Sequence, residues 1–375
     1  MRARVACHTS SGSPSKSRCT CQRNAGSESH SQSMAAFVRE VMRRRLRLPR
    51  DIGHGSANRR LGVVTPLVTM IVPGRDVAAF APAALASLQA QTETRWRALL
   101  VDDGSHDETG AVFAAAAARD ARFRVLRHHE SRGLGAARNV ALDLVDTPFV
   151  GFLDADDELT PRAIETWLAT LDESGSDFVA AAYVRSRLVD GGYRPGRVQP
   201  WVAAATTPRS LGTTLAEHPD ASANIVAWSK LSRATLWERL RFPENVAYED
   251  QVVAQRMYTE ARAFDVVPDV AVHWRVRADG TSITQGKAQL PVLHDYLAAL
   301  LGGIDVLTAA GQSDAVRSRI ALILAMDLPS LRTIAAEHPD PAYRAAVEAF
   351  EASLRALPEY DAARPNAAFS AALAW

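Results

Sequence analysis

Short apolar runs that alternate with helical patterns restrict the fold of this chain more than any other feature of its sequence. Three runs, at 67–72, 96–101 and 148–153, are mostly apolar, which is typical of strands buried on both faces. The segments between them contain three helical patterns and one short strand, at 77–90, 111–119, 133–144 and 123–126. This alternation predicts right-handed crossovers and an α/β fold with a Rossmann-like, mostly parallel sheet flanked by helices.

Residues that could bind a ligand or take part in a reaction stand directly after each of the three apolar runs. These positions hold Pro73, the pair Asp102-Asp103 and the segment Asp154–Asp157. In open α/β sheets the ligand binds outside the carboxyl ends of the strands. We therefore expect the three loops to converge in one crevice.

The second half of the chain is less regular. The expected elements are strands at 177–183 and 266–274, a Gly/Pro-rich turn at 191–195, a segment Trp228–Leu231 that precedes a helix, and a helix at 249–262. An Ala/Leu-rich pattern from 289 to 357 predicts a C-terminal helical extension whose apolar residues mainly form core. The domain organisation expected from these patterns is a tail at 1–33, a basic helix and linker at 34–66, the α/β domain at 67–285, the helical region at 286–357 and a second tail at 358–375.

Composition excludes several classes of function. The net charge of the 375 residues is +1, so no overall field recruits nucleic acid, and we expect no nucleic-acid partner. Cys7, Cys19 and Cys21 are the only cysteines, which excludes a disulfide framework for the body and suits a reducing compartment. We find no apolar stretch of membrane-spanning length and no secretory signal, and we therefore expect a cytoplasmic protein.

The N-terminal region has two parts. Residues 1–33 are rich in Ser, Arg and Gly and cannot form a core, so they are either disordered or an over-extended gene start with Met34 as the initiator. Residues 35–48 form a basic amphipathic pattern ended by Pro49. Such a helix can lie on an anionic membrane at the inner face of the cell membrane, although a short helix packed on the body is the favoured interpretation.

The segment Asp154-Ala155-Asp156-Asp157 is the strongest candidate for a metal site. Carboxylates a few ångströms apart repel one another unless a cation lies between them. Mg²⁺ or Mn²⁺ binds through one or two carboxylates and keeps positions for substrate phosphates. The alternative is a solvated turn in which Asp157 or Glu158 caps the next helix.

Glu249-Asp250 forms a second acidic pair, at the expected start of a helix. Asp250 could act as a general base, which must lie within hydrogen-bond reach of the proton that it removes. The alternative is a pair of negative charges that favours the helix dipole.

Two further segments supply positive charge. Gly133-Leu134-Gly135-Ala136-Ala137-Arg138-Asn139 is not a dinucleotide fingerprint, because its sixth residue is Arg138 and it does not follow the first strand of its unit. Arg138 is instead expected to reach the crevice as a partner for the aspartates or for donor phosphates. Arg275, Arg277 and Ser282 follow the last strand and could clamp a diphosphate, or form an ordinary polar edge.

Taken in order, these motifs resemble those of the family 2 glycosyltransferases. The similarity extends from about Leu67 to Thr284 and rests on the order and spacing of the following segments: Val72-Pro73, Val101–Ser105, Gly133–Asn139, Phe152–Asp157, Trp228–Leu231 and Tyr248–Asp250. The resemblance implies a GT-A fold and an inverting reaction. The loop after the first strand departs from the family pattern, because it reads Pro73-Gly74-Arg75-Asp76 where the family has a small residue, an aromatic residue and Asn after Pro.

The resemblance also implies roles for single residues. Asp103 would contact a uracil-type base, Asp154 the ribose or sugar of the donor, and Asp250 would be the catalytic base. Asp156 would ligate Mn²⁺ or Mg²⁺, and Asp157 would assist. The donor-binding residues expected in total are Pro73, Asp102, Asp103, Arg138, Asp154, Arg275, Arg277 and Ser282.

The function expected from the sequence is the transfer of a sugar from a nucleotide-diphosphate donor, a UDP-sugar, to a hydroxyl group. The acceptor stays open among a glycan, a wall polymer and a lipid-linked sugar. A non-catalytic nucleotide-sugar binding module is the alternative from another class. A sugar nucleotidyltransferase fits less well, because Gly74-Arg75 is too short a basic loop to hold a triphosphate.

Overall fold

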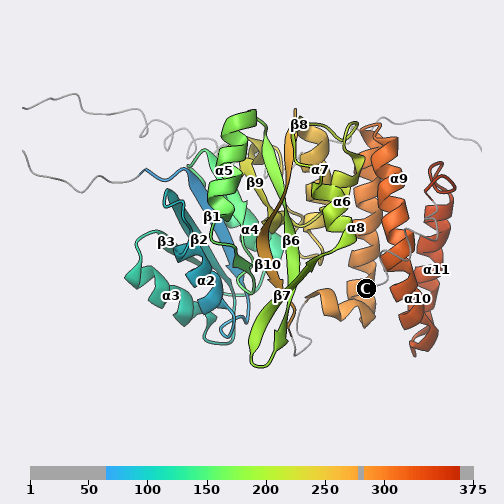
Figure 1. Cartoon of the computed structure of the whole chain (residues 1–375). Coiled ribbons are helices and arrows are strands. Elements are labelled where there is room, and N and C mark those ends of the chain that lie inside the picture. Colours follow the sequence, from blue (N-terminus) through green and yellow to red (C-terminus); the bar gives the residue numbers. More distant parts are fainter. Residues whose placement is uncertain (1–64, 278–282, 364–375) are drawn as a thin grey trace, which may run out of the picture. The chain divides into compact units, whose positions relative to one another are not determined.

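The computed structural model describes residues 65–277 and 283–363, which belong to one compact unit (Figure 1). The expectations for residues 1–33 and 35–48 and for Ser282 lie outside the described residues.

A single mixed sheet organises this unit. Its strands lie in the order β3 (Phe123–His128), β2 (Trp96–Asp103), β1 (Val68–Gly74), β4 (Phe149–Phe152), β9 (Lys230–Arg233), β6 (Phe178–Val189), β10 (Phe264–Arg275) and β5 (Glu158–Leu159), with β7 (Gly192–Val198) beside β6 and β8 (Ser210–Thr213) beside β10. Strands β1, β2, β3, β4, β6 and β10 run in one direction, whereas β9, β5, β7 and β8 run antiparallel to their neighbours. The α/β fold predicted from the sequence is confirmed.

The parallel half of the sheet forms around β1. All seven residues of β1 are buried, as its continuous apolar pattern predicts. Strand order runs from β1 outward through β2 to β3 and then returns to the other side of β1 at β4. This reversal is the kind of point at which α/β sheets bind ligands, outside the carboxyl ends of the strands.

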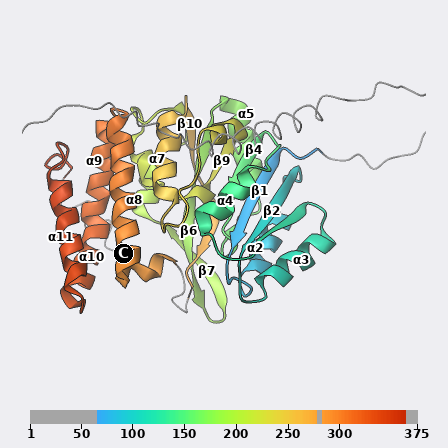
Figure 2. The same cartoon turned by 180° about the vertical axis from the view of Figure 1, so that it is seen from behind.

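Helices cover both faces of the sheet. On the face seen in Figure 1 lie α2 (Ala81–Gln89), α3 (Thr109–Arg119) and α5 (Ala163–Ser174). On the opposite face, seen in Figure 2, lie α4 (Leu134–Leu142) and α7 (Asp250–Glu260), and the short helix α6 (Pro200–Thr206) packs beside β6 and β10.

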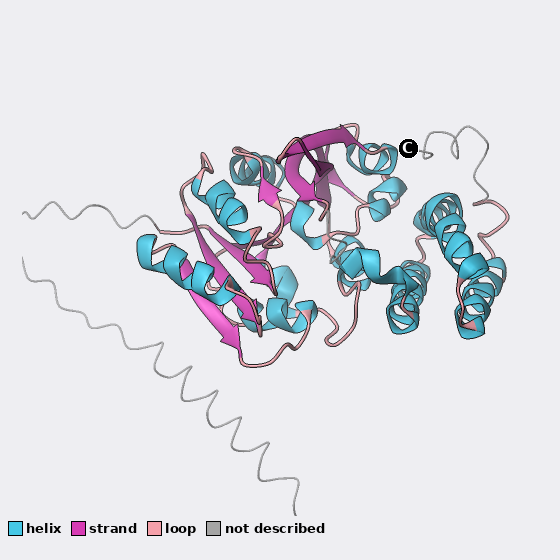
Figure 3. Cartoon of the chain, turned by 90° about the horizontal axis from the view of Figure 1, so that it is seen from below, coloured by secondary structure: helices cyan, strands magenta, loops and turns pink. Residues whose placement is uncertain are grey.

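The C-terminal region is helical, as expected. It consists of α8 (Leu290–Ala309), α9 (Ser313–Leu322), a π-helical turn at Ile323–Asp327, α10 (Leu328–Glu337) and α11 (Pro341–Arg355). Helix α8 packs against α7 and α9, and the helical region lies beside the sheet in the view from below (Figure 3).

Helix α8 corrects one expectation. Among the described helices, it is the one that is long and apolar enough to cross a membrane by length and composition alone. The view that no apolar stretch reaches this length was therefore wrong on these two criteria. Eight residues of α8, Leu293 and Leu300 among them, are buried in the unit, so packing against α7 and α9 accounts for much of its apolar character.

Two local predictions also differ from the structure. The Gly/Pro-rich segment 191–195 was expected to be a turn, but the turn is limited to Asp190-Gly191 and the rest belongs to β7. The segment Trp228–Leu231 precedes the short 3₁₀ helix Ala234–Glu238, as expected, but its last two residues begin the antiparallel strand β9 between β4 and β6, which was not predicted. The four residues of β9 have mixed polarity and show no hydrophobic periodicity. They form a strand because they pair with β4 and β6 on either side.

Candidate active site

The three loops that follow β1, β2 and β4 lie together, as the sequence predicted. The N–H of Ala155 donates to the carbonyl of Pro73 at 3.2 Å, which joins the ends of β4 and β1. The N–H of His106 donates to the Asp76 carboxylate at 2.7 Å, which joins the loops after β1 and β2. Direct hydrogen bonds therefore hold the crevice edge of the parallel half together.

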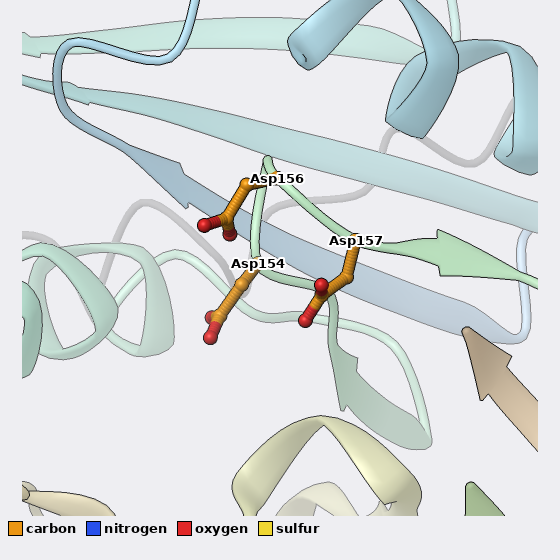
Figure 4. Close-up of side chains that lie close together, drawn as sticks. All are labelled: Asp154, Asp156 and Asp157. Carbon is orange, nitrogen blue, oxygen red and sulfur yellow. The ribbon is translucent and has the colours of Figure 1, made fainter. Parts of the chain in front are cut away.

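The acidic loop after β4 gathers three carboxylates. Oxygen atoms of Asp154, Asp156 and Asp157 all lie within 4.8 Å of one another (Figure 4). Asp157 is 2% exposed. Burial raises the pKa of Asp157 well above its usual value, and the negative charges of Asp156 and Asp154 raise it further. The loop thus concentrates negative charge in a setting that disfavours it.

Two arginines, one at the end of β10 and one just after it, hold this loop in shape. The Nε of Arg277 donates to Oδ2 of Asp156 at 2.9 Å. The backbone N–H of Arg275 donates to Oδ1 of Asp157 at 2.8 Å, and its Nε donates to the Asp156 carbonyl at 2.6 Å. The Arg275 guanidinium also contacts the Phe80 carbonyl and the Glu158 carboxylate. Arg275 is 4% exposed, so in this structure its guanidinium holds protein groups together and is not open to a phosphate ligand.

Arg138 connects the acidic loop to the second acidic pair. Its side chain is 1% exposed, and Nη2 donates to Oδ1 of Asp154 at 2.7 Å while Nη1 donates to Oε1 of Glu249. Burial acts to lower the pKa of Arg138, but the charges of Asp154 and Glu249 outweigh it and keep the pKa raised. The guanidinium carbon also lies 5.1 Å from the centre of the Phe242 ring. A buried cation between two carboxylates thus ties α4 to both loops.

Close packing of α4 on the segment before α7 makes this bridge possible. A Cβ on Gly135 would lie 2.0 Å from the carbonyl oxygen of Pro243, so only glycine fits here. The side chain of Asn139 donates to the Phe242 carbonyl at 2.9 Å and accepts from the Phe242 N–H at 3.0 Å. Gly135 therefore permits the close approach of α4 to the segment before α7, and Asn139 fixes the position of that segment. This approach brings Arg138 within reach of Glu249.

Asp250 begins α7 next to this bridge. Burial and the charge of Glu249 raise the pKa of Asp250 to about 7, while Arg138 opposes the rise. Lys230 is 2% exposed and donates from Nζ to the carbonyls of Asn224 and Val226, both at 2.7 Å. Burial lowers the pKa of the Lys230 ammonium, and the charge of Asp250 opposes this. A carboxyl that gains and loses a proton near neutral pH suits acid–base chemistry.

The two aspartates that end β2 have internal partners. Asp103 accepts hydrogen bonds from Ser131 Oγ at 2.7 Å and from the N–H groups of Arg132 and Gly133 at 3.0 Å, and it lies 2.7 Å from His128 Nδ1. Burial acts to raise the pKa of Asp103, but these hydrogen bonds lower it overall. Its carboxylate is saturated by protein donors, so contact with a base requires one of them to be released.

Asp102 is fully buried. It accepts from the Ser105 N–H at 3.0 Å and pairs with Arg127 Nε at 3.2 Å. Both residues of the pair therefore shape the loops beside the crevice.

The structure thus brings some predicted residues together and leaves others apart. One connected set contains Asp154, Asp156, Asp157, Arg138, Arg275 and Arg277, whereas Asp102 and Asp103 have partners of their own. Sequence reasoning gave Glu249 no partner and Lys230 no role. A lysine directly before an apolar residue in a buried segment was the available signal for Lys230, whereas nothing local in the sequence indicates the contact of Glu249 with Arg138.

The donor set fits a hard divalent cation. The cluster offers oxygen ligands only, which Mg²⁺ and Mn²⁺ prefer. Among the side chains described around it, the five carboxylates of Asp154, Asp156, Asp157, Glu249 and Asp250 outnumber the four cations of Arg138, Arg275, Arg277 and Lys230. A cation would relieve this excess of negative charge.

The fold and the site define a class, and comparison with known structures agrees with it. The UDP complex of residues 1–349 of TarS from S. aureus is similar in structure, with a TM-score of 0.61, over 79% of this chain and 83% of that chain, at 20% sequence identity. The fold is therefore that of the GT-A glycosyltransferases.

Residues 69–225 match the model of the glycosyl transferase family 2. EpsH of Bacillus subtilis is 28% identical over 226 residues, which are 56% of this chain and 61% of EpsH. The Escherichia coli protein named UDP-Glc:alpha-D-GlcNAc-diphosphoundecaprenol beta-1,3-glucosyltransferase WfgD is 29% identical over 117 residues, which are 31% of this chain and 46% of WfgD. The chain thus spans between about half and three fifths of the length of these relatives.

Proposed function

We propose that this protein is an inverting glycosyltransferase that moves a sugar from a UDP-sugar to a hydroxyl group. One observation carries the proposal. The acidic loop after β4 and the carboxyl of Asp250 are two separate acidic sites, and buried Arg138 pairs with Asp154 of the first and with Glu249, the neighbour of Asp250, at the second. The acidic loop suits a metal ion and the donor diphosphate, and Asp250 suits a general base. The names of WfgD and of the TarS complex, which refer to UDP-Glc and UDP, support the choice of donor.

Asp156 and Asp157 would hold the metal ion, and Asp154 would face the ribose or sugar of the donor. When bound, Mn²⁺ or Mg²⁺ supplies Lewis-acid neutralisation of the diphosphate. Arg275 holds the backbone of Asp156, and Arg277 contacts its carboxylate, so both arginines would keep the acidic loop in a fixed shape. A preorganised loop lowers the cost of binding because its groups are already oriented.

Asp250 would act on the acceptor. The acceptor oxygen forms a bond to the anomeric carbon while the bond from that carbon to the diphosphate oxygen breaks, and the configuration inverts. The proton of the acceptor hydroxyl passes to Asp250. Its pKa of about 7, raised by burial and by Glu249, makes it a stronger base than a solvated carboxylate while leaving a substantial ionised fraction at neutral pH.

We further propose that the acceptor is part of a cell-envelope polysaccharide, and that transfer takes place at the cytoplasmic face of the membrane on a lipid-linked sugar. The name of WfgD, which refers to a diphosphoundecaprenol-linked acceptor, supports this choice over a free glycan or a wall polymer.

The test is the variant Asp250→Asn, assayed by release of nucleoside diphosphate across a panel of nucleotide sugars with Mn²⁺ present. Loss of a general base lowers turnover by about 10²–10⁴-fold, whereas binding of UDP should be unchanged. Asp143→Asn is a matched control, because Asp143 is an exposed aspartate paired with Arg241. Near-normal turnover of a folded Asp250→Asn protein would exclude the proposed role. Binding of a nucleotide sugar by the wild type without transfer or hydrolysis would instead favour a non-catalytic binding module.

A further inference from the structure

The hairpin of β6 and β7 projects beyond the edge of the sheet at which the candidate site lies. Strand β6 runs parallel to β10, and Ser186 of β6 is paired with Arg275, the residue whose N–H holds Asp157. From Ser186 the strand continues through Val189 to the turn Asp190-Gly191, and the hairpin stands clear of the other strands in Figures 1 and 2. Four residues of β-strand span about 13 Å, so the turn lies about this far along the strand from Ser186, the residue of β6 that is level with Arg275.

The tip of this hairpin is apolar and exposed. Leu188 is 49% exposed and Val189 is 46% exposed, the highest values among the large hydrophobic residues in the described part of the chain. Asp190 and Gly191 both have positive φ, as tight two-residue hairpin turns require. The two apolar side chains are therefore presented by a well-formed turn rather than by an irregular loop.

Exposed arginines lie along the hairpin. Arg187, Arg194 and Arg197 are exposed, and the structure gives them no acidic partner among the residues it describes. Arg187 and Arg194 lie directly opposite each other in the β6–β7 ladder. Like charges in such a position destabilise a hairpin, and an anionic surface that neutralises both relieves this repulsion.

We propose that the β6–β7 hairpin docks on an anionic phospholipid bilayer, with Leu188 and Val189 inserted among the headgroups and with Arg187 and Arg194 on the anionic lipids. Apolar side chains that enter the interface, flanked by arginines, are the combination by which peripheral proteins bind membranes. Apolar insertion favours a bilayer over a soluble polyanion, since the latter offers no apolar phase for the tip.

Docking at this position would bring the proposed glycosyltransferase close to a lipid-linked acceptor. This part of the inference rests on the proposed function. Interfacial segments lie about 5–10 Å deep in the headgroup region. With the turn about 13 Å along β6 from the level of Arg275, the acidic loop and Asp250 would stand just above the membrane surface. An acceptor sugar carried on a lipid diphosphate would then approach the site from the membrane side.

The experiment is flotation of the full-length protein with phosphatidylcholine vesicles, with and without phosphatidylglycerol. The double variant Arg187→Ser/Arg194→Ser is expected to weaken binding to phosphatidylglycerol vesicles by about 25-fold, since each arginine near an anionic surface contributes about fivefold. Leu188→Ser/Val189→Ser should also weaken binding, with circular dichroism as the check on folding. The matched controls, Arg332→Ser/Arg355→Ser and Leu144→Ser, alter exposed side chains elsewhere and should float like the wild type.

Flotation that is equal for wild-type and hairpin variants would overturn the proposal, as would binding that does not depend on phosphatidylglycerol. Hairpin variants that lose binding to soluble polyphosphate but keep vesicle binding would show a polyanion site instead. Flotation is measured without donor, so it stands apart from catalysis. If the proposed function is wrong, no form of the protein releases nucleoside diphosphate. The flotation experiment would still test whether the hairpin binds membranes.

Discussion

Replacement of Arg138 by Met should destabilise the protein strongly. Methionine keeps an apolar stem of similar reach but removes the cation that pairs with Asp154 and Glu249. Removing one partner of a buried ion pair costs about 3–5 kcal/mol, because an uncompensated charge stays inside. We therefore expect Arg138→Met to lower the free energy of unfolding by about this amount at neutral pH.

The loss should depend on pH in a defined direction. Burial already raises the pKa of Asp154, and the charge of Arg138 opposes the rise. In the variant the pKa of Asp154 rises further, so the folded state binds a proton that the unfolded state releases above a pH of about 4. The stability of the variant relative to wild type therefore falls as pH increases, and the difference should be larger at about pH 8 than at about pH 5.

Urea unfolding followed by circular dichroism measures both effects. Arg132→Met is the matched control, because Arg132 also reaches toward the segment before α7 but is 58% exposed and pairs with Glu244 at 3.2 Å. A surface pair of this kind contributes at most about 1 kcal/mol. If Arg138→Met costs no more than Arg132→Met and shows no pH dependence, the buried bridge does not stabilise the site as we argue.

Three further predictions concern the site. Because the pKa of Asp250 is raised to about 7 and a base acts when ionised, kcat/KM should rise with pH through a midpoint near 7, and Glu249→Gln should move this midpoint to lower pH in initial-rate profiles. Asp156→Asn should weaken Mn²⁺ binding by at least about tenfold in calorimetric titration, since loss of a residue that only orients a metal ligand already costs this much. Unchanged affinity would show that Asp156 is not a metal ligand. Gly135→Ala should lower the free energy of unfolding by about 1–3 kcal/mol, because its Cβ would meet the Pro243 carbonyl at 2.0 Å, while Gly192→Ala, with open space around it, should have little effect.

The sequence predicted the parallel half of the fold well, because each of its strands carries its own signal. The runs at β1, β2 and β4 are apolar on both faces, and a helix lies between β1 and β2, between β2 and β3, and between β3 and β4. The convergence of their loops follows from topology alone. Strands β5 and β9 could not be predicted in this way, because they contain two and four residues and owe their form to the strands beside them.

The sequence indicates where charged residues of the candidate site stand, but not which groups they contact. The acidic loop and Asp250 could be recognised because carboxylates at strand and helix ends are visible in the sequence. The contact of Arg138 with Glu249 spans 111 residues and depends on the close approach at Gly135, which no local pattern encodes. Likewise, Arg275 could be taken for a phosphate ligand from its position after β10, but its burial only becomes evident in three dimensions.

Strand β9 has a consequence for synthesis of the chain. It is the only strand that joins β4 to β6 in the described sheet, although both of those strands are made before it. Until Lys230–Arg233 leaves the ribosome, β4 and β6 each present an open edge, and unpaired edges are sites of aggregation. A nascent chain of this protein therefore passes through a stage with two separate partial sheets. Fragments that end between β7 and β9 would be held at that stage, so any dissection of the protein should keep β9 with both of its neighbours.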